Sequence, residues 1–213
     1  MTTRIEADLL IPGRGEPVTN GVVVAEGRGI VYAGPAPDAP PTPDAATTRV
    51  PVAMPGLWDS HIHFVGSTTA DLHDMLHMPI PEMAVRAAAD ASATLDAGVT
   101  SAREVGGYGL EFAAAINDGT VRGPSIYGAG TILSTTAGHA DAHSFDLDFI
   151  ERSHHWIGEL CDGVPECLKA VRKQLRKDAK VIKICASGGV MSELDHPIHQ
   201  QFSLEELDRT SVV

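Results

Sequence analysis

The sequence is short of positive charge. Its 16 lysine and arginine residues stand against 28 aspartate and glutamate residues, which gives the 213-residue chain a formal net charge of −12 with histidine counted as neutral. No basic patch interrupts this acidic balance. Nucleic acids and anionic membranes attract proteins through basic surfaces, so the composition argues against both as partners.

Long apolar runs and paired cysteines are lacking as well. No stretch approaches the roughly 18 apolar residues of a membrane-spanning helix, and Glu6 and Asp8 stand where a signal peptide needs its apolar core. The three cysteines, Cys161, Cys167 and Cys185, form no Cys-x-x-Cys motif. Such a sparse, odd set is typical of reduced thiols, so we expect a cytoplasmic protein.

Phosphate and dinucleotide loops are also missing, because the glycines lack the required spacing. The chain instead shows two patterns of expected secondary structure. Residues 1–52 contain short strands separated by turns and a Pro-rich connector, which predicts part of a small β-sandwich domain. Residues 53–213 alternate between apolar strands and helices, which predicts an α/β fold with a parallel sheet. The expected strands lie near 52–64, 98–105, 125–133 and 180–187, and the expected helices near 79–97, 108–119 and 164–178.

The run from Met54 to Phe64 brings two histidines, His61 and His63, to the end of an apolar strand. Residues two apart in a strand point to the same face, so the two imidazoles can converge on one metal ion. Neutral imidazole suits zinc and similar metals. In isolation, however, such a pair can equally be two half-exposed strand histidines.

A lysine, Lys183, lies within the apolar strand expected at 180–187. Removing an ammonium group from water costs several kcal/mol, so burial favours the neutral amine. A neutral amine can add carbon dioxide and become a carbamate, an anion with two oxygens that can bridge two metal ions. The alternative is that Lys183 reaches the strand end or pairs with an acid.

Together these segments carry a resemblance. Pro-Gly-Leu-Trp-Asp-Ser-His-Ile-His at 55–63 and Val-Ile-Lys-Ile-Cys-Ala-Ser-Gly-Gly-Val at 181–190 resemble the metal-dependent amidohydrolase superfamily. The likeness is closest to its imidazolonepropionase-like and Xaa-Pro dipeptidase (prolidase-like) or ochratoxinase-like branch. Residues 98–107 are similar to that branch's second barrel strand, and residues 136–141 to its loop after strand three. The resemblance implies a (β/α)8 TIM-like barrel preceded by the sandwich domain.

The resemblance also implies a site. His61 and His63 would bind the more buried of two divalent ions, for which zinc is expected, and a carbamylated Lys183 would bridge the two ions. His139 matches the position where prolidase-like members hold a substrate carboxylate, although it can also be a loop histidine that satisfies nearby backbone groups. His199 follows the fourth strand, at the catalytic end of a barrel, and is a candidate substrate contact. The general-base aspartate is expected beyond the chain end, so no catalytic residue is assigned.

The length fits only part of such a barrel. A (β/α)8 barrel takes about 250 residues, and after the sandwich segment this chain has room for about four βα units. We therefore interpret it as the N-terminal half of the barrel, with a truncated or frameshifted C-terminus as a hypothesis. Arg103 and Glu104, at the end of the second strand, are expected to form an ion pair at the barrel mouth.

The predicted activity is metal-dependent hydrolysis of a carbon–nitrogen bond in a small amide, such as an Xaa-Pro dipeptide or an N-acyl amino acid. Bound ions would polarise the scissile carbonyl and lower the pKa of a water molecule. One alternative is a cyclic-amide hydrolase resembling imidazolonepropionase. Another is an inactive half-barrel that persists as a homo-oligomer or a subunit, because its sheet edge would be exposed.

Overall fold

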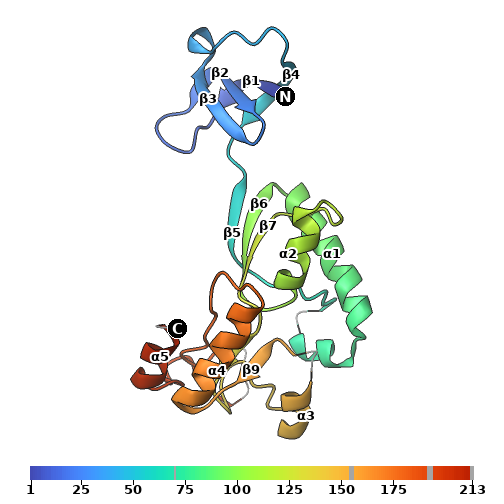
Figure 1. Cartoon of the computed structure of the whole chain (residues 1–213), viewed down its shortest axis with the longest axis vertical. Coiled ribbons are helices and arrows are strands. Elements are labelled where there is room, and N and C mark those ends of the chain that lie inside the picture. The colour runs from blue at the N-terminus through green and yellow to red at the C-terminus, as the bar shows by residue number, and fades with distance from the viewer. Residues whose placement is uncertain (70, 154–155, 191–193, 212–213) are drawn as a thin grey trace. The chain divides into compact units, whose positions relative to one another are not determined.

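The computed structural model describes residues 1–69, 71–153, 156–190 and 194–211. It divides the chain into two compact units, Met1–Gly56 and Leu57–Val213 (Figure 1). The domain boundary expected at residues 52/53 lies inside the last strand of the first unit, Ala46–Ala53. No helix among the described residues is long and apolar enough to cross a membrane.

The first unit is a four-stranded sheet of β1 (Thr2–Leu10), β2 (Val18–Glu26), β3 (Gly29–Pro35) and β4 (Ala46–Ala53). Its strand order is β3-β2-β1-β4, with antiparallel hairpin pairs and β4 parallel to β1. Along part of β2 every second side chain is buried, as at Val22 and Val24, because successive strand residues point to opposite faces. The Pro-rich connector holds only a short 3-10 helix, η1 (Ala36–Asp38).

The single strand expected at 52–64 is wrong. The structure has two strands there, β4 in the first unit and β5 (Leu57–Ile62) in the second, with residues 54–56 between them. The separation has a local cause, because Pro55 has no N–H to donate to a ladder and Gly56 disfavours extended structure.

The second unit begins with a parallel sheet in the order β5-β6-β7, formed by β5, β6 (Val99–Glu104) and β7 (Ser125–Gly128). A 3-10 helix, η2 (Leu72–His77), and helix α1 (Ile80–Asp96) connect β5 to β6, and α2 (Gly109–Asn117) connects β6 to β7. Figure 1 shows both α-helices beside this sheet. Small residues let α1 approach the sheet closely, because its Ala87 and Ala91 pack in one cluster with Ala102 of β6. Gly98 ends α1 with φ +91°, at the C′ position where glycine is expected.

The third strand is interrupted. β7 ends at Gly128, the chain turns through Gly130 at φ +74°, and β8 (Ile132–Ser134) resumes the direction. β8 pairs in parallel with β9 (Gly158–Leu160), a short strand that the sequence analysis does not predict.

The regular strand expected at 180–187 is wrong in form, although the segment lies where a fourth strand belongs. Lys180 N–H donates to Gly128 O at 3.0 Å, and Leu133 N–H donates to Lys183 O at 2.9 Å. The ladder pairing of this segment among the described residues consists of two isolated bridges, a parallel one between Leu133 and Ile184 and an antiparallel one between Ser187 and Gln200.

Three further helices complete the unit: α3 (Leu147–Arg152), α4 (Gly163–Arg176) and α5 (Leu204–Thr210). α4 buries Cys167, Ala170 and Val171 against Leu133 and Phe202, which joins the third strand to the C-terminal segment. The free cysteines at 161, 167 and 185 are all buried. The predicted α/β class is confirmed.

Candidate metal centre

His61 and His63 lie at the C-terminal end of β5, with their ring centroids 5.3 Å apart and the ring planes at 66°. The backbone N–H of His61 donates to Asp59 Oδ1 at 2.9 Å, so the Asp59 carboxylate stabilises the end of the strand. The two imidazoles are therefore brought together by their own strand, as the spacing predicts.

The tautomer of His63 follows from its hydrogen bond. Its Nδ1 lies 2.8 Å from the carbonyl oxygen of Gly106, which follows β6. A carbonyl oxygen can only accept, so Nδ1 carries the proton and the neutral ring keeps a lone pair on Nε2. Metal-binding histidines commonly use one ring nitrogen in this way, which fixes the ring for coordination by the other.

Lys183 contributes to the electrostatic environment of His61, although the two residues lie on separate segments of the chain. Burial lowers the pKa of His61, and electrostatic interaction with Lys183 and then with His63 lowers it further. Lys183 is half-buried. The segment around Lys183 is hydrogen-bonded to β8, and its end is also joined to a later segment, where Gln201 N–H donates to Ala186 O at 3.0 Å.

The three predicted ligands do not make a complete metal site. In the described part of the chain, no group of three or more His, Cys, Asp or Glu side chains could hold a metal ion. Two imidazoles and a lysine-derived carbamate would leave coordination positions of a two-metal site unfilled. The residues present are nevertheless of the kind that binds divalent metals, with one imidazole already fixed in a suitable tautomer.

Glu104, at the end of β6, is the functional candidate that sequence reasoning missed. It is fully buried, and burial raises the pKa of its carboxyl to about 7, partly offset by the backbone N–H groups of Gly109, Phe64 and Gly106. The expected ion pair with Arg103 does not form between these two described residues. Neighbouring strand residues point to opposite faces, and Arg103 Nε donates instead to Ser60 O at 2.7 Å. The available signal was the glycine-rich sequence that follows Glu104.

His139 lies exposed in the turn after β8. Its backbone N–H donates to Gln201 Oε1 at 3.1 Å, and its ring lies directly against the Cα of Gly189, where a β-carbon would collide with it. Asp195 Oδ2 accepts from Gln201 Nε2 at 2.6 Å and from Gly189 N–H at 3.2 Å. The structure therefore places His139 against the loop that follows Lys183.

His199 is exposed on the same loop. Its carbonyl oxygen accepts from Gly188 N–H at 3.1 Å, and its ring centroid lies 5.6 Å from that of His196. Both predicted substrate contacts thus neighbour the Gly188–Gly189 backbone. Whether either touches a substrate stays a prediction.

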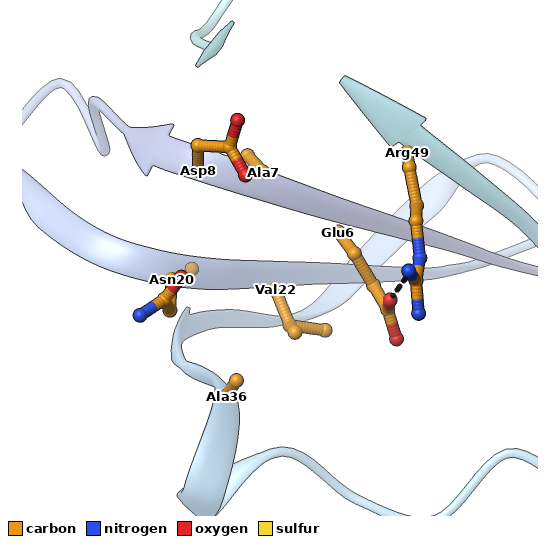
Figure 2. A pocket seen from close by; sticks show the side chains of 8 residues that line it. Glu6, Ala7, Asp8, Asn20, Val22, Ala36 and Arg49 are labelled. Carbon is orange, nitrogen blue, oxygen red and sulfur yellow. Dashed lines mark hydrogen bonds and ion pairs between the residues drawn. The ribbon is translucent and has the colours of Figure 1, made fainter. Parts of the chain in front are cut away.

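A pocket in the first unit contains none of the five predicted residues (Figure 2). It has a volume of about 300 Å³, and an ion pair of 3.1 Å between Arg49 Nε and Glu6 Oε2 forms part of its lining. The remaining lining residues are Ala7, Asp8, Asn20, Gly21, Val22 and Ala36. This set offers no imidazole or thiolate, so the pocket does not resemble the centre at β5.

Comparison with known proteins identifies the class. Residues 52–211 match the amidohydrolase family, and the chain belongs to that family. It is 44% identical over 221 residues to ochratoxinase from Aspergillus niger, an alignment that covers 96% of this chain and 46% of the relative. The chain therefore spans about half the length of the curated relatives it matches.

Solved structures agree with this assignment. The crystal structure of A. niger ochratoxinase matches with a TM-score of 0.92 and 41% identity, over 98% of this chain and 52% of that one. A prolidase complexed with N-methylphosphonate-L-proline matches with a TM-score of 0.87 and 32% identity, over 99% and 52%. A Xaa-Pro dipeptidase with bound methionine matches with a TM-score of 0.81 and 27% identity, over 99% and 53%. The predicted resemblance and the partial TIM-like barrel are confirmed.

Proposed function

We propose that this chain supplies part of the metal centre of a hydrolase that cleaves a carbon–nitrogen bond of amide or peptide type. The observations that carry the proposal are the pairing of His61 and His63 at the end of β5, with ring centroids 5.3 Å apart, and the charge of Lys183 among the causes that lower the pKa of His61. Relatives named for hydrolysis of such bonds, a prolidase and a Xaa-Pro dipeptidase, support the reaction class. Amidohydrolases generally bind divalent metals, which supports the cofactor class.

The roles of the three residues follow from their chemistry. His63 would offer Nε2, because Nδ1 is engaged with Gly106, and His61 would offer a second imidazole nitrogen. Lys183 would react through its neutral amine: the nitrogen bonds to the carbon of carbon dioxide, a proton is released, and the resulting carbamate presents two anionic oxygens. Two divalent ions held there, zinc being the first choice, would polarise the scissile carbonyl and activate water.

The substrate we propose is an N-acyl amino acid or an Xaa-Pro dipeptide. Both carry a free carboxylate beside the scissile amide. The exposed imidazole of His139, held by the Gly188–Gly189 loop, supports recognition of that carboxylate, with His199 on the same loop as a second contact. The cyclic-amide alternative has no carboxylate in this position, so it gives His139 no comparable role.

The first experiment is the metal-to-protein ratio of the purified, size-fractionated chain after loading with zinc and bicarbonate. We expect bound zinc in the wild type and loss of it in His61→Ala, His63→Ala and Lys183→Ala. His196→Ala, which changes a nearby loop histidine, is the matched control and should retain the wild-type ratio. A ratio near zero in the folded wild type would overturn the proposal for this chain.

Assays of zinc-loaded chain on Xaa-Pro dipeptides, N-acyl amino acids and a cyclic amide then separate the substrate classes. We expect His139→Ala to reduce turnover of the carboxylate-bearing amides and to spare the cyclic one. Equal loss on both would show that His139 does not act by recognising the carboxylate, and turnover of the cyclic amide alone would favour the cyclic-amide alternative.

An exposed aromatic pair favours a second possibility, that the chain functions only within an assembly. Trp58 of β5 and Tyr127 of β7 are in contact, with ring centroids 4.9 Å apart and planes tilted by 35°, while remaining 52% and 44% exposed. Large apolar groups exposed on a sheet face are typical of surfaces that another protein segment covers. Sedimentation of the wild type and Trp58→Ser tests this, because self-association through the face should weaken in the variant.

A further inference from the structure

Glu104 is a buried carboxyl with an incomplete set of partners. It is 0% exposed, its Oε1 accepts from Gly109 N–H at 3.1 Å, and its Oε2 has no hydrogen-bond partner within the described part of the chain. Burying such a group is costly unless its bonds are satisfied. An apolar side chain of similar volume would fill the same space without this desolvation cost, so the carboxyl is not explained by packing alone.

The turn after β6 is built around this carboxyl. A β-carbon on Gly107 would collide with Glu104 Oε1, and one on Gly109 would lie 2.7 Å from its Cδ. Gly106 and Gly107 also have φ values of +140° and +143°, which side chains rarely adopt. Residues 106–109 can therefore wrap against Glu104 only because glycines stand at positions 106, 107 and 109.

The same turn holds the end of β5. Gly106 O accepts the Nδ1 proton of His63 at 2.8 Å, and Tyr108 N–H donates to Phe64 O at 3.2 Å. A continuous chain of contacts thus runs from the Glu104 carboxyl, through the glycine turn, to the imidazole of His63. This chain of contacts includes the Gly106 carbonyl, whose hydrogen bond places the proton of His63 on Nδ1 and leaves Nε2 unprotonated.

We propose that Glu104 is a positioning residue that acts through the turn of residues 106–109, holding the Gly106 carbonyl against His63 so that Nε2 is left for a metal ion. The role proposed for Glu104 rests on the proposed metal centre, whereas the contacts that join Glu104, the turn and His63 do not depend on it. Glu104 acts on the metal only through His63.

The test compares Glu104→Gln, which keeps an acceptor oxygen at nearly the same place, with Glu104→Ala and the shortened Glu104→Asp. Ile150→Ala, which removes buried apolar volume in α3 away from the turn, controls for lost stability. Two measurements on the full chain are needed. Nitrogen-15 NMR of the metal-free protein reports the tautomer of His63, and calorimetric titration with zinc reports affinity.

We expect Glu104→Ala and Glu104→Asp to shift His63 away from the Nδ1–H tautomer and to weaken zinc binding about 10- to 100-fold. Glu104→Gln and Ile150→Ala should resemble the wild type in both measurements. If Glu104→Ala does not fold, Glu104→Asp carries the test. An unchanged tautomer and affinity in a folded Glu104→Asp or Glu104→Ala would overturn the inference.

The two proposals fail in different ways. If the wild type binds no zinc but Glu104→Asp still changes the His63 tautomer, the metal centre is wrong and the positioning role stands. If the wild type binds zinc and the variants bind it equally with an unchanged tautomer, the positioning role is wrong and the metal centre stands.

Discussion

His63 and Gly106 are joined by a hydrogen bond of 2.8 Å between Nδ1 and the carbonyl oxygen, although they follow different strands of the parallel sheet. The bond depends on a turn conformation with φ near +140°. The carbonyl oxygen of Gly106 therefore connects a backbone conformation that requires glycine with the choice of protonated nitrogen in His63.

Replacing Gly106 by alanine should destabilise the protein more than an ordinary glycine replacement. A β-carbon there would lie 2.6 and 2.7 Å from the Ile132 side chain and would force an unfavourable φ of +140°. We expect a loss of about 2–4 kcal/mol in free energy of unfolding, measured with urea. Gly119→Ala has a positive φ but open space, and should cost only about 1 kcal/mol. Equal losses would contradict the crowding described here.

The raised pKa of Glu104 predicts a specific pH dependence of stability. In the folded state its carboxyl binds a proton up to about pH 7, whereas the unfolded chain releases that proton near 4.5. Folding therefore becomes less favourable as pH rises from about 4.5 to 7, by about 3 kcal/mol in total, and changes little above that range. Glu104→Gln lacks this loss, so its stability advantage should grow between pH 5 and pH 8 in urea unfolding. An advantage independent of pH would count against the assignment.

Gly189→Ala should displace the imidazole of His139. The added β-carbon would collide with the ring, and the exposed ring can move more readily than the backbone. We expect a clear change in the carbon-13 NMR signals of His139 with the fold retained. Gly29→Ala, whose β-carbon would meet nothing nearer than 3.8 Å, is the control and should leave those signals in place. If both variants give the wild-type spectrum, the contact between the ring and the loop is absent in solution.

Ser203→Ala should weaken helix α5. Ser203 Oγ accepts from Glu206 N–H at 3.3 Å, and Glu206 Oε2 accepts from Ser203 N–H at 2.6 Å, which together form a capping box. Loss of the hydroxyl should cost about 1 kcal/mol in urea unfolding. Glu206→Ala should cost more, because Glu206 Oε1 also accepts from Gly163 N–H at the start of α4. The reverse order would show that the bond to Gly163 contributes nothing.

Local chemistry explains which elements the sequence predicts well. Helix α1 is found at Ile80–Asp96, within the range expected from its alanine-rich pattern, and Gly98 closes it as a C′ glycine. Such signals depend on neighbours along the chain. β9, only three residues long, and α3 were not predicted, because β9 forms through pairing with β8, a strand far from it in sequence.

The candidate site likewise has features that the local sequence predicts and features that depend on residues distant in the chain. The convergence of His61 and His63 follows from strand alternation, a local property. The burial of Glu104 follows from how a later turn folds over it, and Lys183 lies in a segment held by isolated bridges to distant residues rather than in a regular strand. The ion pair expected between Arg103 and Glu104 failed because adjacency in a strand places side chains on opposite faces.

A metal site formed by both His61 and Lys183 would require a curved sheet. His61 follows from β5, and the Lys183 segment lies three strand spacings away, beyond β6 and the broken third strand, which would amount to roughly 14 Å in a flat sheet. The charge of Lys183 nevertheless contributes to the lowered pKa of His61, and a metal site shared by the two residues would need a bend of the sheet that turns their side chains toward each other. Zinc affinity would then serve as a gauge of that bend: a partner, mutation or solvent condition that flattens the sheet would be detected as weaker metal binding, even with every ligand intact.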